Sequence, residues 1–233
     1  MTPRKICILG SSYVGAVYSA YRHAGASAEF ELDFYGHSNG GFPSVDIVAG
    51  QIRNTRFRSP GGSGLVSDYE AFVVYADLPS PHDLSKIMGA CARDGLSQQV
   101  TEALIADVIT SKAAYRIAET LRDGTGRPVF LVSANVVSIS KAKLDAESYA
   151  RAVALIEGAL GAGAYIAFPG SLYDERYRPR PEFYKDSVLL TGDKATDTPG
   201  HDYHHMNEAG GAEVLRAVLD HLVGEFPPER RVA

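Results

Sequence analysis

Short apolar runs that alternate with helical segments constrain the fold of this chain more than any other feature. Lys5–Leu9, Ala71–Tyr75 and Val129–Val132 are three such runs. Their length suits strands that are buried on both faces of a sheet. Phe30–Tyr35 alternates apolar and polar side chains, and Tyr165–Phe168 is a fifth short run, so five strands are expected.

Helical patterns fill the intervals between these runs. One follows the first run and ends at Ala24. Others cover about Ser97–Leu121, Ala146–Leu160 and a last helix that carries Val214 to Leu222. The apolar stripe expected on the second of these helices consists of Val100, Leu104, Val108 and Ile109. Alternating strands and helices imply a parallel sheet covered on both faces. The sequence therefore predicts one domain over residues 1–233, a three-layer α/β/α fold with a five-stranded parallel sheet in a flavodoxin-like arrangement.

Overall charge and composition narrow the classes of function. The formal net charge of −5 is a weak argument against nucleic-acid binding, which calls for a clustered basic surface. Arg53, Arg56 and Arg58 are expected to lie in a solvated loop. The two cysteines form no disulfide framework, and Cys7 is expected to be buried.

The N-terminal segment resembles a signal peptide only superficially. Arg4 and Lys5 precede an apolar stretch, but serines and tyrosines interrupt that stretch, and Arg22 lies near the apparent cleavage point. The first strand and helix of the fold are the preferred interpretation, together with a cytoplasmic location. No stretch approaches the ~20 apolar residues of a membrane span.

Ser12 follows the first strand almost directly, at the predicted turn into a helix. Backbone N–H groups at a helix start favour negative charge, which suits a serine nucleophile whose adduct becomes an oxyanion. Ser11 or Ser12 can equally act as a simple N-cap. A phosphate-binding loop is a weaker alternative, because Gly10–Gly15 lacks the glycine spacing of nucleotide-binding motifs.

Asp202 and His205 lie three residues apart, just before the last helix. If this segment turns, the carboxylate bonds one imidazole nitrogen and leaves the other free to take a proton from a serine. Metal binding and a polar surface loop are the alternatives, but no second ligand cluster is evident. The prediction is a Ser12, His205, Asp202 triad with no metal and no cofactor. Asn207 is expected to cap the last helix.

The two ends of the chain together resemble the SGNH (GDSL-like) hydrolases. Ile8–Ala16, with the sequence ILGSSYVGA, is similar to the family's first block, with Ser12 at the nucleophile position. Asp202–Gly210, with the sequence DYHHMNEAG, is similar to its last block, in which the aspartate and the histidine complete the triad. The order and separation of the blocks agree with the family. The resemblance implies hydrolysis of small acyl esters, including acetyl groups on carbohydrates.

Several positions depart from the family's pattern. Ser11 stands where the family has aspartate. The family's oxyanion donors are a glycine after strand two and an asparagine after strand three. Gly36 fits the first loosely, with Gly40 and Gly41 in competition. No such asparagine follows strand three, where the chain has Asp77, so Asn39 and Asn135 are alternative donors or simple turn residues.

The leading functional hypothesis is ester hydrolysis through an acyl-serine intermediate. Tyr173, Tyr177 and Tyr184, which lie near three arginines, either line a sugar or polar acyl site or pack on the body of the fold. An O-acyltransferase with the same triad and a sugar acceptor is one alternative. A non-catalytic binding protein that retains the fold is another. The expected partner is a small-molecule or carbohydrate ester, and the sequence does not decide the oligomeric state.

Overall fold

The computed structural model describes residues 2–25, 27–133, 144–191 and 205–227. The five predicted strands form as β1 (Arg4–Gly10), β2 (Phe30–Gly36), β6 (Ala71–Tyr75), β7 (Val129–Val132) and β8 (Tyr165–Ile166). They run parallel, in the order β2-β1-β6-β7-β8. The prediction of a five-stranded parallel sheet is nevertheless wrong. A sixth strand, β5 (Phe57–Arg58), pairs antiparallel with β2 and makes the sheet mixed.

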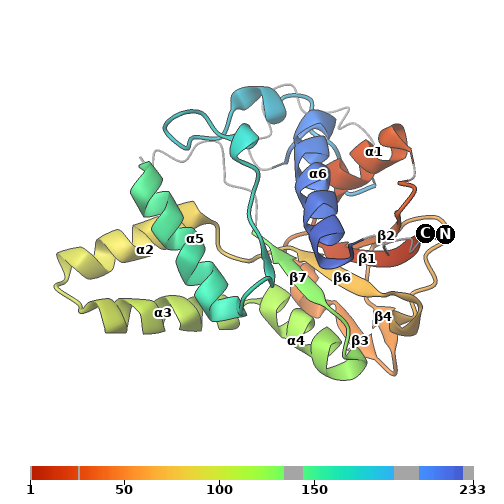
Figure 1. Ribbon diagram of the computed structural model, residues 1–233, viewed down its shortest axis with the longest axis horizontal. Coiled ribbons are helices and arrows are strands. Elements are labelled where there is room, and N and C mark those ends of the chain that lie inside the picture. The colour runs from red at the N-terminus through yellow and green to blue at the C-terminus, as the bar shows by residue number, and fades with distance from the viewer. Residues whose placement is uncertain (1, 26, 134–143, 192–204, 228–233) are drawn as a thin grey trace, which may run out of the picture.

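Helices cover both faces of this sheet (Figure 1). Alternate residues of a strand point to opposite faces, so Ile6 and Ile8 pack in one core while Cys7 and Leu9 pack in the other. One face is covered by α1 (Val14–Ala24) and α6 (Glu208–Glu225), which lie side by side. The helices associated with the other face are α2 (Pro81–Arg93), α3 (Gln98–Thr110), α4 (Ala113–Thr125) and α5 (Ala146–Leu160).

The prediction of one helix over Ser97–Leu121 is wrong. The chain breaks at Ser111 and Lys112 and forms α3 and α4 separately, and α2 precedes them as a further helix. The expected apolar stripe is also displaced on α3, because Val100 and Leu104 are exposed. The buried side of α3 consists of Thr101, Ile105 and Ile109.

The long connection after β2 is more ordered than a loop. It contains η1 (Phe42–Ser44), the hairpin of β3 (Asp46–Val48) and β4 (Gln51–Arg53), then β5 and η2 (Val66–Asp68). The turn residues Ala49 and Gly50 both have positive φ, as the tight hairpin turns require.

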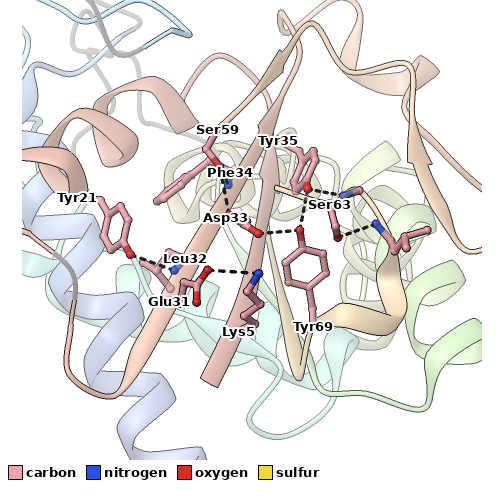
Figure 2. A network of polar contacts seen from close by, with 12 residues as sticks. Lys5, Tyr21, Glu31, Leu32, Asp33, Phe34, Tyr35, Ser59, Ser63 and Tyr69 are labelled. Atoms are coloured by element: carbon pink, nitrogen blue, oxygen red, sulfur yellow. Dashed lines mark hydrogen bonds and ion pairs between the residues drawn. The ribbon is translucent and has the colours of Figure 1, made fainter. Parts of the chain in front are cut away.

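A buried polar network anchors this connection to β2 (Figure 2). The hydroxyl of Tyr69 donates to Oδ2 of Asp33 over 2.9 Å and lies 2.7 Å from the hydroxyl of Tyr35. The backbone N–H of Gly64 donates to the Tyr35 hydroxyl. Ser59 donates to Asp33 and accepts from the backbone N–H of Phe34. Burial raises the pKa of Tyr69 well above its ordinary value, so this hydroxyl remains a donor to the Asp33 carboxylate.

The carboxyl ends of three adjacent strands meet at one edge of the sheet. Gly10 at the end of β1 is in register with Gly36 at the end of β2 on one side and with Tyr75 at the end of β6 on the other. The segments that begin at these residues therefore start side by side. Sites in open α/β sheets form at such an edge.

Candidate active site

Ser12 lies on the short turn between β1 and α1. Just before this turn β1 approaches β6 closely, because a Cβ on Gly10 would lie 2.0 Å from the carbonyl oxygen of Tyr75, a clash that only glycine avoids. The N-cap position of α1 is occupied by Tyr13, without a side-chain hydrogen bond. The alternative in which Ser11 or Ser12 serves as a capping side chain is therefore wrong, and the Ser12 hydroxyl is available for other contacts.

Ser12 and His205 lie in direct contact although 193 positions separate them in the sequence. The Ser12 Oγ is 2.8 Å from Nε2 of His205, and the contact is partly buried. The ring of Tyr13 lies beside the imidazole, with 6.1 Å between the ring centroids. The 2.8 Å between Ser12 Oγ and His205 Nε2 is the distance expected between a nucleophile and its general base.

Close packing of α6 on α1 brings the two residues together. A Cβ on Gly211 would lie 2.1 Å from the carbonyl oxygen of Ala16, so glycine allows the two helices to approach backbone to backbone. Asn207 caps α6, as predicted, with Oδ1 accepting from the N–H of Gly210 over 3.0 Å. Its Nδ2 also donates to the carbonyl oxygens of Glu182 and Lys185. The residues that position α6 thus fix the start of the helix just after His205.

Asn39 is the third side chain at this site. Its Oδ1 lies 3.1 Å from Ser12 Oγ. The turn that carries it is held by backbone hydrogen bonds from Gly41 and Phe42 to the carbonyl oxygen of Ser38, and by the fully buried ring of Phe42. The N–H of His37 also donates to the carbonyl oxygen of Gly10. Asn39, predicted as an alternative oxyanion donor, is therefore a neighbour of the hydroxyl.

A single hydroxyl proton limits how these three groups pair. Ser12 can donate either to Asn39 Oδ1 or to His205 Nε2, but not to both. If Ser12 donates to the imidazole, rotation of the Asn39 amide by half a turn presents Nδ2 as a donor toward Ser12 Oγ. That arrangement leaves an amide donor, an acceptor imidazole and a hydroxyl at one point.

The two backbone positions predicted as oxyanion donors, Ser12 and Gly36, differ in their surroundings. Within the described part of the chain, the N–H of Ser12 donates to no acceptor. Gly36 ends β2 next to Gly10, and a Cβ on it would lie 2.5 Å from Cδ1 of Leu190. Glycine at position 36 is thus explained by the close packing of Leu190, which is a reason that the sequence alone does not provide.

The remaining predicted residues have different positions. Asp77 lies away from this contact, because its carboxylate accepts from the N–H groups of Ala113 and Ala114 at the start of α4. Ser11 is buried, and its Oγ has no partner among the described residues, so no supporting hydrogen bond replaces the one expected from aspartate. Asp202 and Asn135 lie outside the described residues.

The tyrosine-rich segment after β8 packs on the body of the protein. Tyr173 and Tyr184 are buried, and Tyr149 stacks on Tyr177 with 4.6 Å between centroids. Arg178 pairs with Asp174, which holds the pKa of that carboxyl at about 2. The sequence left open whether these tyrosines line a substrate site or pack on the body of the fold. Tyr173 and Tyr184 pack on the body.

Within the described ranges, no group of three or more histidine, cysteine, aspartate or glutamate side chains is arranged to hold a metal ion. In the same part of the chain, no helix has both the length and the apolar character needed to cross a membrane. No family model matches this sequence, and no curated protein is significantly similar to it.

Proposed function

We propose that the protein is a carboxylic ester hydrolase of the SGNH type that works through an acyl-serine intermediate. One observation carries the proposal, namely the 2.8 Å contact between Ser12 Oγ and His205 Nε2 at the carboxyl edge of the sheet. The packing of α6 on α1 thus brings a serine and a histidine from opposite ends of the chain into hydrogen-bonding distance, as a nucleophile and its general base require. The order of the five parallel strands, which is also that of flavodoxin-like sheets, supports the same family resemblance.

In the first half of the reaction, Ser12 Oγ attacks the carbonyl carbon of the ester while His205 Nε2 accepts the hydroxyl proton. The carbonyl oxygen becomes an oxyanion, and we assign Asn39 Nδ2 and the N–H of Ser12 as its donors. The bond to the alcohol oxygen then breaks, and His205 returns the proton to that oxygen. Acyl-Ser12 and the free alcohol result.

In the second half, a water molecule replaces the alcohol. His205 takes a proton from the water, whose oxygen attacks the acyl carbon, and the same donors stabilise the second oxyanion. The bond to Ser12 Oγ breaks, and His205 returns the proton to Ser12. By the resemblance of its block to the family motif, Asp202 orients His205 through Nδ1.

Labelling by a fluorophosphonate tests the nucleophile. Wild-type protein should become covalently labelled at Ser12, because the reagent reports an activated serine. Ser12→Ala should abolish labelling and leave the circular dichroism spectrum and thermal midpoint unchanged. Ser11→Ala is the matched control, because the Ser11 hydroxyl is one residue away and has no partner in the described chain. Persistent labelling of Ser12→Ala, or labelling that depends on Ser11, would contradict the proposal.

A further inference from the structure

A cavity of about 460 Å3 opens beside Ser12 and His205, which both line it. Its size lies within the range of pockets that enclose a whole small-molecule ligand. An acetyl group would fill a small part of it. The identity of the group that this cavity holds is the subject of the inference, which rests on the proposed hydrolase function.

Four apolar side chains form much of the cavity wall. They are Phe57 of β5 and three consecutive residues after η4 (Pro181–Phe183), namely Val188, Leu189 and Leu190. The Leu189 side chain is 51% exposed, although large aliphatic side chains are usually buried. An apolar ligand that covers this exposed leucine would remove apolar surface from water, which stabilises the bound state.

Two glycines allow this wall to pack closely against the rest of the fold. A Cβ on Gly15 would lie 2.0 Å from the carbonyl oxygen of Leu189, and a Cβ on Gly36 would lie 2.5 Å from Cδ1 of Leu190. The wall segment therefore packs directly on the first turn of α1 and on the end of β2. Such contacts make the apolar wall a preformed part of the site, so it need not be ordered when a ligand binds.

We infer that the cavity binds an apolar acyl chain of the ester, with about four to eight carbons, in preference to acetyl. The alcohol oxygen must face His205, which protonates it as it leaves. The apolar side chains Leu190 and Phe57 lie on the β2 side of the cavity, because Leu190 packs against Gly36 and Phe57 pairs with Gly36 across the sheet edge. The acyl chain is the part of the ester that extends to that side. Arg56 also lines the cavity, but its exposed side chain keeps its charge in water.

Steady-state kinetics on p-nitrophenyl acetate, butanoate, hexanoate and octanoate test the chain preference. Burial of each methylene is worth about fourfold in kcat/KM. We expect kcat/KM to rise at least tenfold from acetate to hexanoate in the wild-type protein. A second series, acetate esters of ethanol, butanol and hexanol, should show no such rise, because the alcohol does not occupy the apolar wall.

Leu189→Asn should lower the ratio of kcat/KM for hexanoate to that for acetate at least fivefold. The substitution is tolerable because this side chain is half exposed. Leu104→Asn is the matched control, since Leu104 is 41% exposed on α3 and does not line the cavity. It should leave the ratio unchanged.

The outcomes separate the inference from the proposed function. A flat acyl series with Ser12-dependent hydrolysis, or a rise that follows the alcohol instead, would overturn the inference alone. If no ester in either series shows Ser12-dependent hydrolysis, the proposed function fails, and binding decides the inference. Hexanamide should then bind to the Ser12→Ala protein at least tenfold more tightly than acetamide by calorimetry, and Leu189→Asn in that background should remove the difference. Equal binding of the two amides would overturn the inference.

Discussion

Replacement of Asn39 by alanine should lower kcat for ester hydrolysis by about ten- to a hundredfold, which corresponds to about 1.4–2.7 kcal/mol of barrier. A single oxyanion donor is worth about 3–4 kcal/mol in a site that excludes water. Asn39 lies 3.1 Å from Ser12 Oγ but is exposed to solvent, so water can replace part of the lost bond. KM should change little, because the lost hydrogen bond exists mainly in the transition state.

A second substitution separates the donor role from packing and from acceptance of the Ser12 proton. Asn39→Asp keeps the shape of the side chain and its acceptor oxygen but, when ionised, provides no donor. If Asn39 stabilises an oxyanion, Asn39→Asp should be at least as slow as Asn39→Ala at neutral pH. If Asn39 only accepts from Ser12, as its Oδ1 is oriented in the structure, Asn39→Asp should retain activity.

The assay is initial-rate hydrolysis of a p-nitrophenyl ester, with the thermal midpoint of each variant measured in parallel. Asn135→Ala is the comparison, because Asn135 is the other asparagine that the sequence offers as a donor, and it should cause no comparable loss. Near-wild-type kcat in Asn39→Ala would refute the reasoning and leave the backbone N–H of Ser12 as the assigned oxyanion donor. A large loss in Asn135→Ala would refute the choice of Asn39.

Three further predictions concern residues around the site. Asp202→Ala should retain more activity than His205→Ala in the same assay, because in the proposed mechanism the carboxylate only orients the imidazole while His205 moves the proton. Asp77→Ala should lower the free energy of unfolding in urea by about 0.5–2 kcal/mol through loss of the α4 cap, and kcat should change less than threefold. Burial lowers the pKa of His82 below the ordinary histidine value of about 6.5, so the unfolded chain takes up a proton first as the pH falls. The free energy of unfolding should therefore decrease on acidification below about pH 6.5, and less so in His82→Gln, as measured by urea titration at pH 5.5 and 7.5.

The strands were the most predictable part of the fold. β6 and β7 form over the predicted residues, since a continuous apolar run buried on both faces has sharp polar or turn boundaries. α5 also follows the predicted range, because Asp145 caps its start through the N–H of Ser148 and Gly161 follows its end. In these elements the local signals and the tertiary packing agree.

The helices between β6 and β7 were predicted less well because the local apolar pattern was misleading. Val100 and Leu104 follow helical spacing, yet both are exposed, so the predicted stripe was right only at Ile109, which is buried on α3. The sequence does contain a local signal for the start of α2. Ser80 and Asp83 form a capping box, and Pro81 occupies the first helical position, a combination typical of a helix start.

The sixth strand was not predictable from local sequence. β5 contains only Phe57 and Arg58, and its pairing with β2 depends on how the preceding connection folds back. The polar network of Asp33, Tyr35 and Tyr69 anchors that connection, but Tyr69 lies 36 positions from Asp33 and 34 from Tyr35 in the sequence. The same long-range geometry places Asn39 beside Ser12, which residue spacing alone does not reveal.

The position of Asn39 offers a physical account of the asparagine that is absent after the third predicted strand. Asp77, which follows that strand, accepts two hydrogen bonds from backbone N–H groups at the start of α4, so its carboxylate stabilises the helix start and does not face Ser12. β1 has a neighbour on each side, and its terminal Gly10 is in register with the ends of both β2 and β6. A donor that follows either neighbour therefore starts equally close to Ser12. On our proposal, the connection after β2 supplies an amide that the family takes from the other side, because the oxyanion requires a donor at a point in space and not at a fixed position in the sequence.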